Sequence, residues 1–362
     1  MTLEEKKNNM FSSEQLETVH NMIGEDEPSL FSVLQHLSKQ YDEKTTIFLA
    51  KEFCLKCESD ENQRVALEFL YMNGFRDEII KVVKQNLDSE NQVNREWGEV
   101  YNFILERRKN LRFEGELSGF AENYTTSDPT LSCLLIFLKV YSCIKNNDYV
   151  ALRQNLADLT EKLLKVDNTL MRVYFQAREN EVLFHFHWKR NELEIARHYA
   201  DNFIQNTYYQ LKRCEMILNV AITYMFEDYQ KSMELLDNSR DIALDYDFYF
   251  YVEAIDQHTR PFVKNVNGVT DQPPTDDEAE YAHYLINIGE NDKALKILNK
   301  FKDPSVFQEY YKALALDDEE LLYKVYDKLI SGSDDYFFAE LPLRALNKKG
   351  GVYHEEKSNP IN

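Results

Sequence analysis

A short polar turn followed at once by an amphipathic helix recurs along this chain, and this unit limits the possible folds more than any other feature. The clearest copies are residues 190–200, 226–236 and 289–298. Each copy follows an earlier apolar helix, so the repeating object is a helical hairpin. Because one hairpin cannot bury its apolar stripe alone, it has to stack on its neighbours. The pattern predicts an all-α, right-handed superhelical solenoid of degenerate tetratricopeptide-like helical hairpins, whose concave wall suits binding.

Composition and charge narrow the class of partner. The 362 residues include only Gly 10 and Pro 8, which favours helices nearly throughout. The formal net charge of −21 opposes general affinity for nucleic acid, since neutralisation of phosphates by Lys and Arg supplies most of that binding. No apolar leader follows Met1, and the longest apolar run, 131–144, is too short to span a bilayer. We therefore expect a cytoplasmic protein without a membrane partner.

The sequence predicts three parts. Residues 1–30 form a short acidic segment, in which Ser12 starts one short helix. Residues 31–350 form the solenoid, and residues 351–362 form a polar tail. The solenoid is expected to contain an irregular stretch at 109–128, a loop at 264–275 and a capping box at 275–278. Its expected hairpins are 44–58 with 63–72, 76–87 with 95–108, 129–145 with 149–164, 169–188 with 192–206, 211–226 with 229–243, 276–288 with 292–301, and 304–315 with 318–330.

Two groups of potential metal ligands have simpler explanations. Cys54 and Cys57 are three residues apart, but no second Cys or His pair follows to complete a zinc site, so we interpret them as buried thiols. His185 and His187 point to different faces of a helix and cannot chelate one ion together. Nothing in the chain matches a nucleophile elbow, a P-loop or a Rossmann fingerprint. We expect no metal, no cofactor and no enzymatic activity.

Polar side chains within apolar helices are the candidate ligand contacts. His185 and Lys189 are one turn apart and are expected on a polar groove wall. Asn219 lies in the otherwise apolar stretch 216–224, where a buried amide requires hydrogen-bond partners. It could cap a neighbouring helix, or it could face the groove and hold a peptide backbone, because one amide both donates and accepts.

Several segments, taken in order, resemble the arbitrium receptors (AimR) of SPbeta-group Bacillus phages, which belong to the peptide-sensing tetratricopeptide regulators. The resemblance covers roughly residues 30–350. The segments that carry it are 64–69 (RVALEF), 96–101 (EWGEVY), 193–200 (LEIARHYA), 223–229 (TYMFEDY) and 335–343 (DYFFAELPL). The resemblance implies a dimer in the bacterial host cytoplasm that binds operator DNA through an N-terminal helix-turn-helix. It also implies that a short secreted peptide in the groove sets the lysis–lysogeny decision.

The chain departs from the family at several functional positions. Residues 1–30 contain two lysines, whereas a recognition helix needs basic or amide side chains over phosphates and base edges. His185 and Lys189 stand where the family has two asparagines, and Leu211 stands where it has a peptide-contacting arginine. Asp335 matches a family contact, and its carboxylate could pair with a cationic peptide side chain.

These observations predict a peptide-sensing regulator with Asp335, Asn219, His185 and Lys189 as peptide-binding residues. The peptide would act by favouring one state of the solenoid and so changing a second binding event, with DNA or a regulatory protein. One alternative is a protein-binding scaffold without a signal peptide. The other is a DNA-binding regulator that acts through the reduced N-terminus, as a homodimer.

Overall fold

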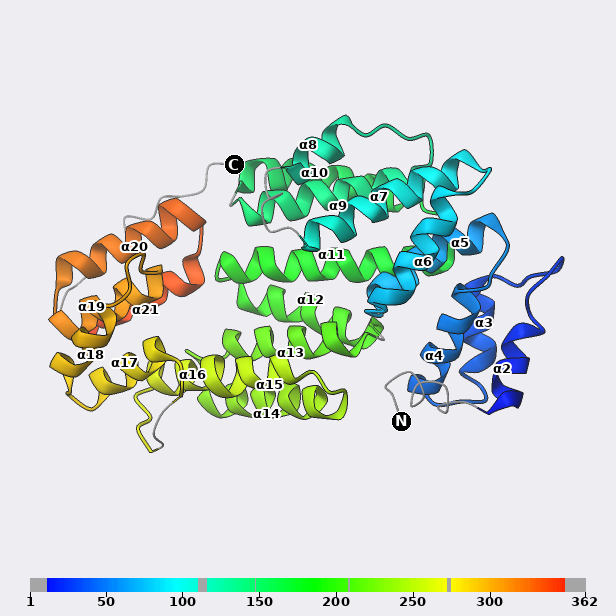
Figure 1. Ribbon diagram of the computed structural model, residues 1–362. Helices are drawn as coiled ribbons and strands as arrows, with labels where there is room; N and C mark the ends of the chain where they lie inside the picture. The colour runs from blue at the N-terminus through cyan, green and yellow to red at the C-terminus, as the bar shows by residue number, and fades with distance from the viewer. Residues whose placement is uncertain (1–11, 110–115, 147, 208, 272–274, 349–362) are drawn as a thin grey trace. The chain divides into compact units, whose positions relative to one another are not determined.

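The computed structural model describes residues 12–109, 116–146, 148–207, 209–271 and 275–348, and within these ranges every regular element is a helix (Figure 1). The chain divides into two compact units. We call Met1–Val182 with Gln205–Arg213 the N-terminal unit, and Leu183–Ile204 with Cys214–Asn362 the C-terminal unit. Three helices begin in one unit and end in the other, namely α11 (Thr169–Lys189), α12 (Leu193–Asn206) and α13 (Gln210–Thr223).

The N-terminal unit is built from antiparallel hairpins in which consecutive helices pack against each other, as in α5 with α6, α6 with α7, and α9 with α10. Helix α2, the first described helix, is part of this packing, because it lies against α4. Its helices are α2 (Ser13–His20), α3 (Leu30–Leu37), α4 (Glu43–Cys54), α5 (Asp60–Met72), α6 (Arg76–Leu87), α7 (Gln92–Lys109), α8 (Glu116–Asn123), α9 (Pro129–Lys145), α10 (Tyr149–Leu163) and most of α11 (Thr169–Lys189).

The C-terminal unit continues the same plan, with hairpins α17 with α18, α19 with α20, and α20 with α21. One interruption of regular α-helix in this unit is a short π-helix, η1, which is inserted directly between two α-helices. Its helices are most of α12 (Leu193–Asn206) and α13 (Gln210–Thr223), then α14 (Tyr229–Asp245), α15 (Tyr249–Glu253), η1 (Ala254–Thr259), α16 (Arg260–Val266), α17 (Glu278–Asn287), α18 (Asn291–Leu298), α19 (Val306–Leu316), α20 (Glu319–Ser333) and α21 (Tyr336–Lys348).

Local capping explains why these helices begin where they do. The Ser12 hydroxyl accepts from the Gln15 N–H while the Gln15 side chain accepts from the Ser12 N–H, which confirms the predicted helix start. Ser305 and Gln308 form the same box at α19. The hairpin turn before α18 uses Gly289 at φ +81°, a left-handed conformation that favours glycine.

Three local predictions are wrong. The expected loop at 264–275 begins later, because α16 runs to Val266 before Gly268 turns the chain at φ +68°. The cap of α17 is Asp277, whose carboxylate accepts from two N–H groups of the first turn, so 275–278 is not a Ser/Thr capping box. Within the irregular stretch 109–128, residues Glu116–Asn123 form α8.

The last described helix, α21, was not among the expected hairpins. Asp334 adopts φ +45° and turns the chain out of α20, and α21 then continues through Pro342 to Lys348. Phe337 and Leu341 of α21 are fully or almost fully buried in the C-terminal unit. The predicted tail, 351–362, lies outside the described residues, and the divisions expected at residues 30 and 350 stay predictions.

A buried charge network ties together helices that are far apart in the sequence of the N-terminal unit. Arg178 of α11 donates to Glu68 of α5 from Nε at 2.7 Å and from Nη2 at 3.0 Å. Both residues are buried, and Tyr101 of α7 donates its hydroxyl to the same carboxylate. The Arg178 guanidinium also lies 4.7 Å from the ring centre of Tyr71. The carboxylate and guanidinium therefore compensate each other inside an apolar core.

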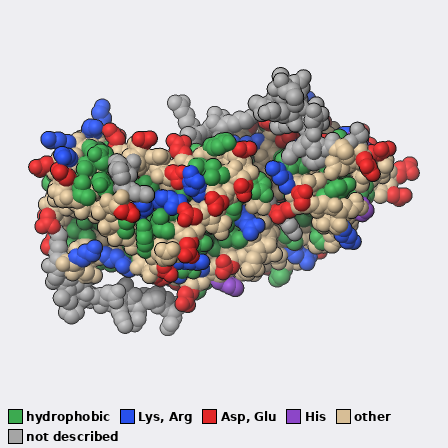
Figure 2. All heavy atoms as spheres, turned by 90° about the horizontal axis from the view of Figure 1, so that it is seen from below, with side chains coloured by type: hydrophobic (Ala, Val, Ile, Leu, Met, Phe, Trp, Pro, Cys, Tyr) green, Lys and Arg blue, Asp and Glu red, His purple; other side chains and the backbone are tan. Residues whose placement is uncertain are grey.

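The predicted buried thiols are confirmed. Cys54 and Cys57 are both buried and free, and burial raises the pKa of the Cys57 thiol to about 12. No group of three or more metal-ligating side chains occurs in the part of the chain that the structure describes. On the face that Figure 2 shows, acidic and basic side chains are interspersed, with hydrophobic side chains between them.

Candidate functional site

Two of the predicted contact residues, Lys189 and Asp335, bind each other. Lys189 ends α11 and Asp335 precedes α21, and the Lys189 ammonium donates to Asp335 Oδ2. The other carboxylate oxygen, Oδ1, accepts from the N–H of Phe338 at 3.1 Å and so caps the first turn of α21. The Asp335 side chain is only 6% exposed. Both of its oxygens thus already have partners within the chain.

The Lys189 ammonium also lies over aromatic rings. It is 5.2 Å from the ring centre of Phe338 and 5.7 Å from that of Trp188. Its side chain is 31% exposed, whereas the Asp335 side chain is almost fully buried. The ion pair is therefore enclosed on the carboxylate side and open on the ammonium side.

The other two predicted residues are half-buried in the same unit. The His185 ring, one turn before Lys189, lies 5.1 Å from the Phe184 ring and 6.0 Å from the Trp188 ring. Its neighbour His187 instead pairs with Glu192 at 2.6 Å, which confirms that the two imidazoles face different ways. Asn219 of α13 forms no side-chain hydrogen bond with any described residue, so the capping alternative for it is not observed.

A cavity of about 330 Å³ lies beside this ion pair, and we call it the aromatic cavity. Phe338, three residues after Asp335, packs in its wall against Phe307 at 5.0 Å and Phe262 at 6.2 Å between ring centres. The sequence did not predict this cavity, although Phe307 and Phe338 both lie in the first turn after a capping residue. Its lining is Ile222, His258, Thr259, Phe262, Asp277, Ala279, Glu280, Ser305, Phe307, Gln308, Tyr311 and Phe338.

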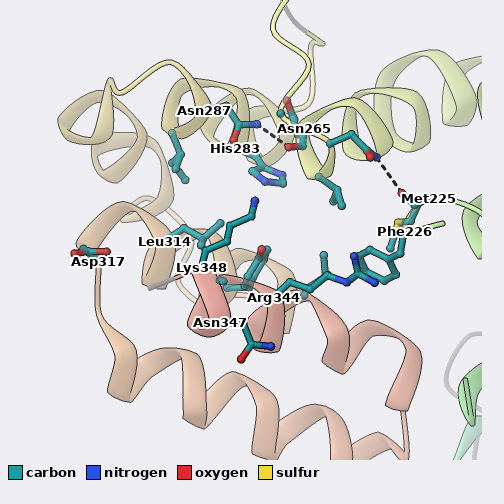
Figure 3. A pocket seen from close by; sticks show the side chains of 17 residues that line it. Met225, Phe226, Asn265, His283, Asn287, Leu314, Asp317, Arg344, Asn347 and Lys348 are labelled. Carbon is teal, nitrogen blue, oxygen red and sulfur yellow. Dashed lines mark hydrogen bonds between the residues drawn. The ribbon is translucent and has the colours of Figure 1, made fainter. Parts of the chain in front are cut away.

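A second cavity, of about 790 Å³, lies on another side of α21, and we call it the Arg344 cavity (Figure 3). Arg344 donates from Nε to Glu340 at 3.3 Å and stacks on Phe226, 4.4 Å from its ring centre. The lining is Met225, Phe226, Asn265, Val266, Asn267, Gly268, His283, Ile286, Asn287, Tyr310, Leu314, Asp317, Leu341, Arg344, Ala345, Asn347 and Lys348.

A buried polar network connects residues that line the aromatic cavity with residues that line the Arg344 cavity. Tyr311 donates to Glu280 Oε1 at 2.5 Å, and Asn265 donates to Glu280 Oε2 at 3.2 Å. The His283 ring stacks on Tyr311 with 4.2 Å between centres. Burial, together with the nearby Glu280 carboxylate, raises the pKa of Tyr311 well above its usual value. Glu280 and Tyr311 line the aromatic cavity while Asn265 and His283 line the Arg344 cavity, so this network fixes both surfaces.

The fold and this ligand-sized pair of cavities define a helical-repeat binding protein, and comparison with known proteins gives the family. Residues 46–348 match the family described as AimR transcriptional regulator-like. The chain belongs to this family. The expected resemblance to the arbitrium receptors, and with it a peptide-sensing phage regulator, is therefore confirmed.

Individual relatives agree with this assignment. The chain is 22% identical over 348 residues to the AimR transcriptional regulator of Bacillus phage SPbeta, covering 89% of each chain. The same values hold for the SPbeta prophage-derived uncharacterized protein YopK of Bacillus subtilis (strain 168). At these values the likeness extends over nearly the whole length of both proteins.

Two solved structures share the fold. The structure named phAimR-Ligand has a TM-score of 0.72 at 20% identity and covers 89% of this chain and 96% of that chain. The structure named SeMet-phAimR has a TM-score of 0.71 at 19% identity, with 96% and 92% covered. The predicted all-α solenoid of helical hairpins is thereby confirmed. No helix in the described ranges is long and apolar enough to cross a membrane.

Proposed function

We propose that the C-terminal unit holds a short signalling peptide against the aromatic cavity, and that peptide occupancy controls a lysis–lysogeny transcriptional decision in the bacterial cytoplasm. The observation that carries this proposal is the position of the cavity. It adjoins Lys189 and Asp335, which the family resemblance predicts at contact positions, through the ring of Phe338. A peptide in this place would touch α11, α13 and α21 together.

The cavity provides the kind of anchor that a short peptide needs. Few residues carry most of the affinity in such interfaces, and these are aromatic or apolar groups in desolvated pockets. The rings of Phe262, Phe307 and Phe338 would bury one apolar peptide side chain. Burial contributes about 25 cal/mol per Å² of apolar surface removed from water.

Polar groups around the cavity would orient the peptide backbone. The Asn219 amide has no hydrogen-bond partner among the described residues, and it can donate to one peptide carbonyl and accept from one peptide N–H. His185 is half-buried one turn before Lys189 and is proposed to face the same ligand. Asp335 would act through its hold on Lys189 and on the first turn of α21, since both carboxylate oxygens are already occupied.

The regulatory step would follow from a population shift. A peptide that contacts α11, α13 and α21 stabilises the arrangement in which these helices lie together, and so favours one state of the protein. The second binding event, with operator DNA or with a regulatory protein, would change by the same coupling free energy. DNA contact through residues 1–30 and homodimerisation stay predictions.

Calorimetry with synthetic peptides encoded beside the gene tests the proposal. We expect one of them to bind to the full chain, and Phe307→Ala to weaken that binding by about tenfold or more, because an aromatic anchor is lost. Phe250→Ala is the matched control, because that phenylalanine is 75% exposed and lies outside the cavity.

Absence of binding by all such peptides at high micromolar concentration would contradict peptide sensing. Capture of a partner protein under the same conditions would then favour the scaffold alternative. Equal loss of affinity in Phe307→Ala and Phe250→Ala would place the peptide elsewhere.

A further inference from the structure

The Arg344 cavity presents cationic donors on the wall formed by α21. Arg344 and Lys348 are one turn apart on this helix, and both side chains extend into the cavity (Figure 3). Among described residues, Glu340 is the only side chain that accepts from Arg344, and it takes Nε. Lys348 forms no ion pair with any described residue. The terminal Nη atoms of Arg344 and the ammonium of Lys348 are thus available to an acceptor.

The opposite wall presents acceptors. Asn267 donates its amide to the backbone oxygens of Met225 at 3.1 Å and Val263 at 2.8 Å. Asn287 donates its amide to the backbone oxygen of Asn265 at 2.8 Å, as Figure 3 shows. No described group donates to the side-chain oxygens of Asn267 and Asn287. Since the amides are tied to the backbone, their oxygens are held as acceptors.

The charge of this cavity contrasts with that of the chain. Its lining carries two cations, Arg344 and Lys348, and one carboxylate, Asp317, whereas the whole chain has a formal net charge of −21. Asp317 lies at the far edge of the view in Figure 3, away from Arg344. Phe226 and Leu314 add apolar surface to the lining.

Cationic donors, amide acceptors and apolar surface in one lining match one class of ligand. We propose that the Arg344 cavity binds a carboxylate that has an N–H donor and an aliphatic side chain close to it. The carboxylate would pair with Arg344 and Lys348 through charge-assisted hydrogen bonds, and the N–H would donate to Asn267 or Asn287. The C-terminal residue of a peptide and a free amino acid both have this chemistry. The proposal concerns a site separate from the aromatic cavity and does not depend on peptide sensing there.

Three probes test the ligand class by calorimetry on the full chain: the tripeptide Gly-Leu-Ala, the same tripeptide with a C-terminal amide, and free leucine. We expect a free-acid probe to bind. The amide should bind at least about tenfold more weakly, because charge-assisted hydrogen bonds are lost. Binding by the tripeptide alone assigns the cavity to peptide ends, and binding by leucine alone assigns it to amino acids. Equal binding of acid and amide, or no binding of any probe at 10 mM, would overturn the proposal.

Variants of the cavity locate the binding. Arg344→Gln and Lys348→Gln should each lower the affinity for the free-acid probe by about tenfold. Lys324→Gln is the control, because this lysine is 62% exposed on α20 and pairs with Glu320 away from the cavity. Thermal melts confirm that the variants stay folded. If Gly-Leu-Ala responds to Phe307→Ala and not to Arg344→Gln, the probe occupies the aromatic cavity and the proposal is wrong. The outcome at the Arg344 cavity does not decide whether a signalling peptide binds at the aromatic cavity.

Discussion

Replacing Arg178 by methionine is expected to lower the free energy of unfolding of the N-terminal unit by about 3–5 kcal/mol, the usual cost of removing one partner from a buried ion pair. Glu68 would keep a carboxylate that is fully buried, and the Tyr101 hydroxyl would be its one remaining donor among the described side chains. Because these residues lie on α5, α7 and α11, the loss would affect three helices at once.

Urea denaturation followed by circular dichroism measures the effect. Lys165→Met provides the control, because its pair with Glu161 is 54% and 69% exposed, and loss of such a solvated pair is expected to leave the stability nearly unchanged. The double variant Glu68→Leu with Arg178→Met should be less destabilised than Arg178→Met alone, since no uncompensated charge remains. A change below about 1 kcal/mol in Arg178→Met would show that the network does not stabilise this unit.

Replacing Lys189 by alanine is expected to lower the stability of the C-terminal unit and to create a site for an external cation. The Asp335 carboxylate is 6% exposed and would lose the ammonium that neutralises it. We expect a loss of about 1–3 kcal/mol, below the value for a fully buried pair because the lysine is 31% exposed. n-Propylammonium supplies the atoms that the substitution removes, and it should restore part of the lost stability.

Thermal unfolding with and without n-propylammonium measures this rescue. Lys328→Ala is the control, because the Lys328 side chain is 57% exposed in its pair with Glu309. The amine should not restore stability in this variant. An equal response of the two variants to the amine would contradict the role of Lys189 as an internal cation for Asp335. The Lys189→Ala variant should also prefer cationic peptides over neutral peptides more strongly than the wild-type chain does.

Hairpins could be predicted from sequence because their signals are local. The Asp228 carboxylate caps α14 by accepting from the Lys231 N–H at 2.9 Å, and Asn191 turns the chain at φ +61° before α12. Each of these residues stands in a polar turn that directly precedes an apolar periodicity. Helix α21 also follows a polar turn, in which Asp335 accepts from the Phe338 N–H, but Pro342 inside this helix has the form of a stop.

The partners of charged residues could not be predicted, because they are remote in sequence. Glu68 and Arg178 are 110 positions apart, and Lys189 and Asp335 are 146 apart. The residue types alone left Lys189 and Asp335 as two separate ligand contacts. Only the packing of α21 against the end of α11 shows that each satisfies the other. The aromatic cavity likewise needs α16, α19 and α21 to be placed together.

Hydrogen exchange with and without the signalling peptide tests the central claim most directly, because it reports which helices the peptide protects. The account predicts increased protection in α13 around Asn219 and in the first turn of α21 after Asp335, with α2 to α6 unchanged. Protection confined to the N-terminal unit, or no protection at a peptide concentration that saturates binding, would contradict it.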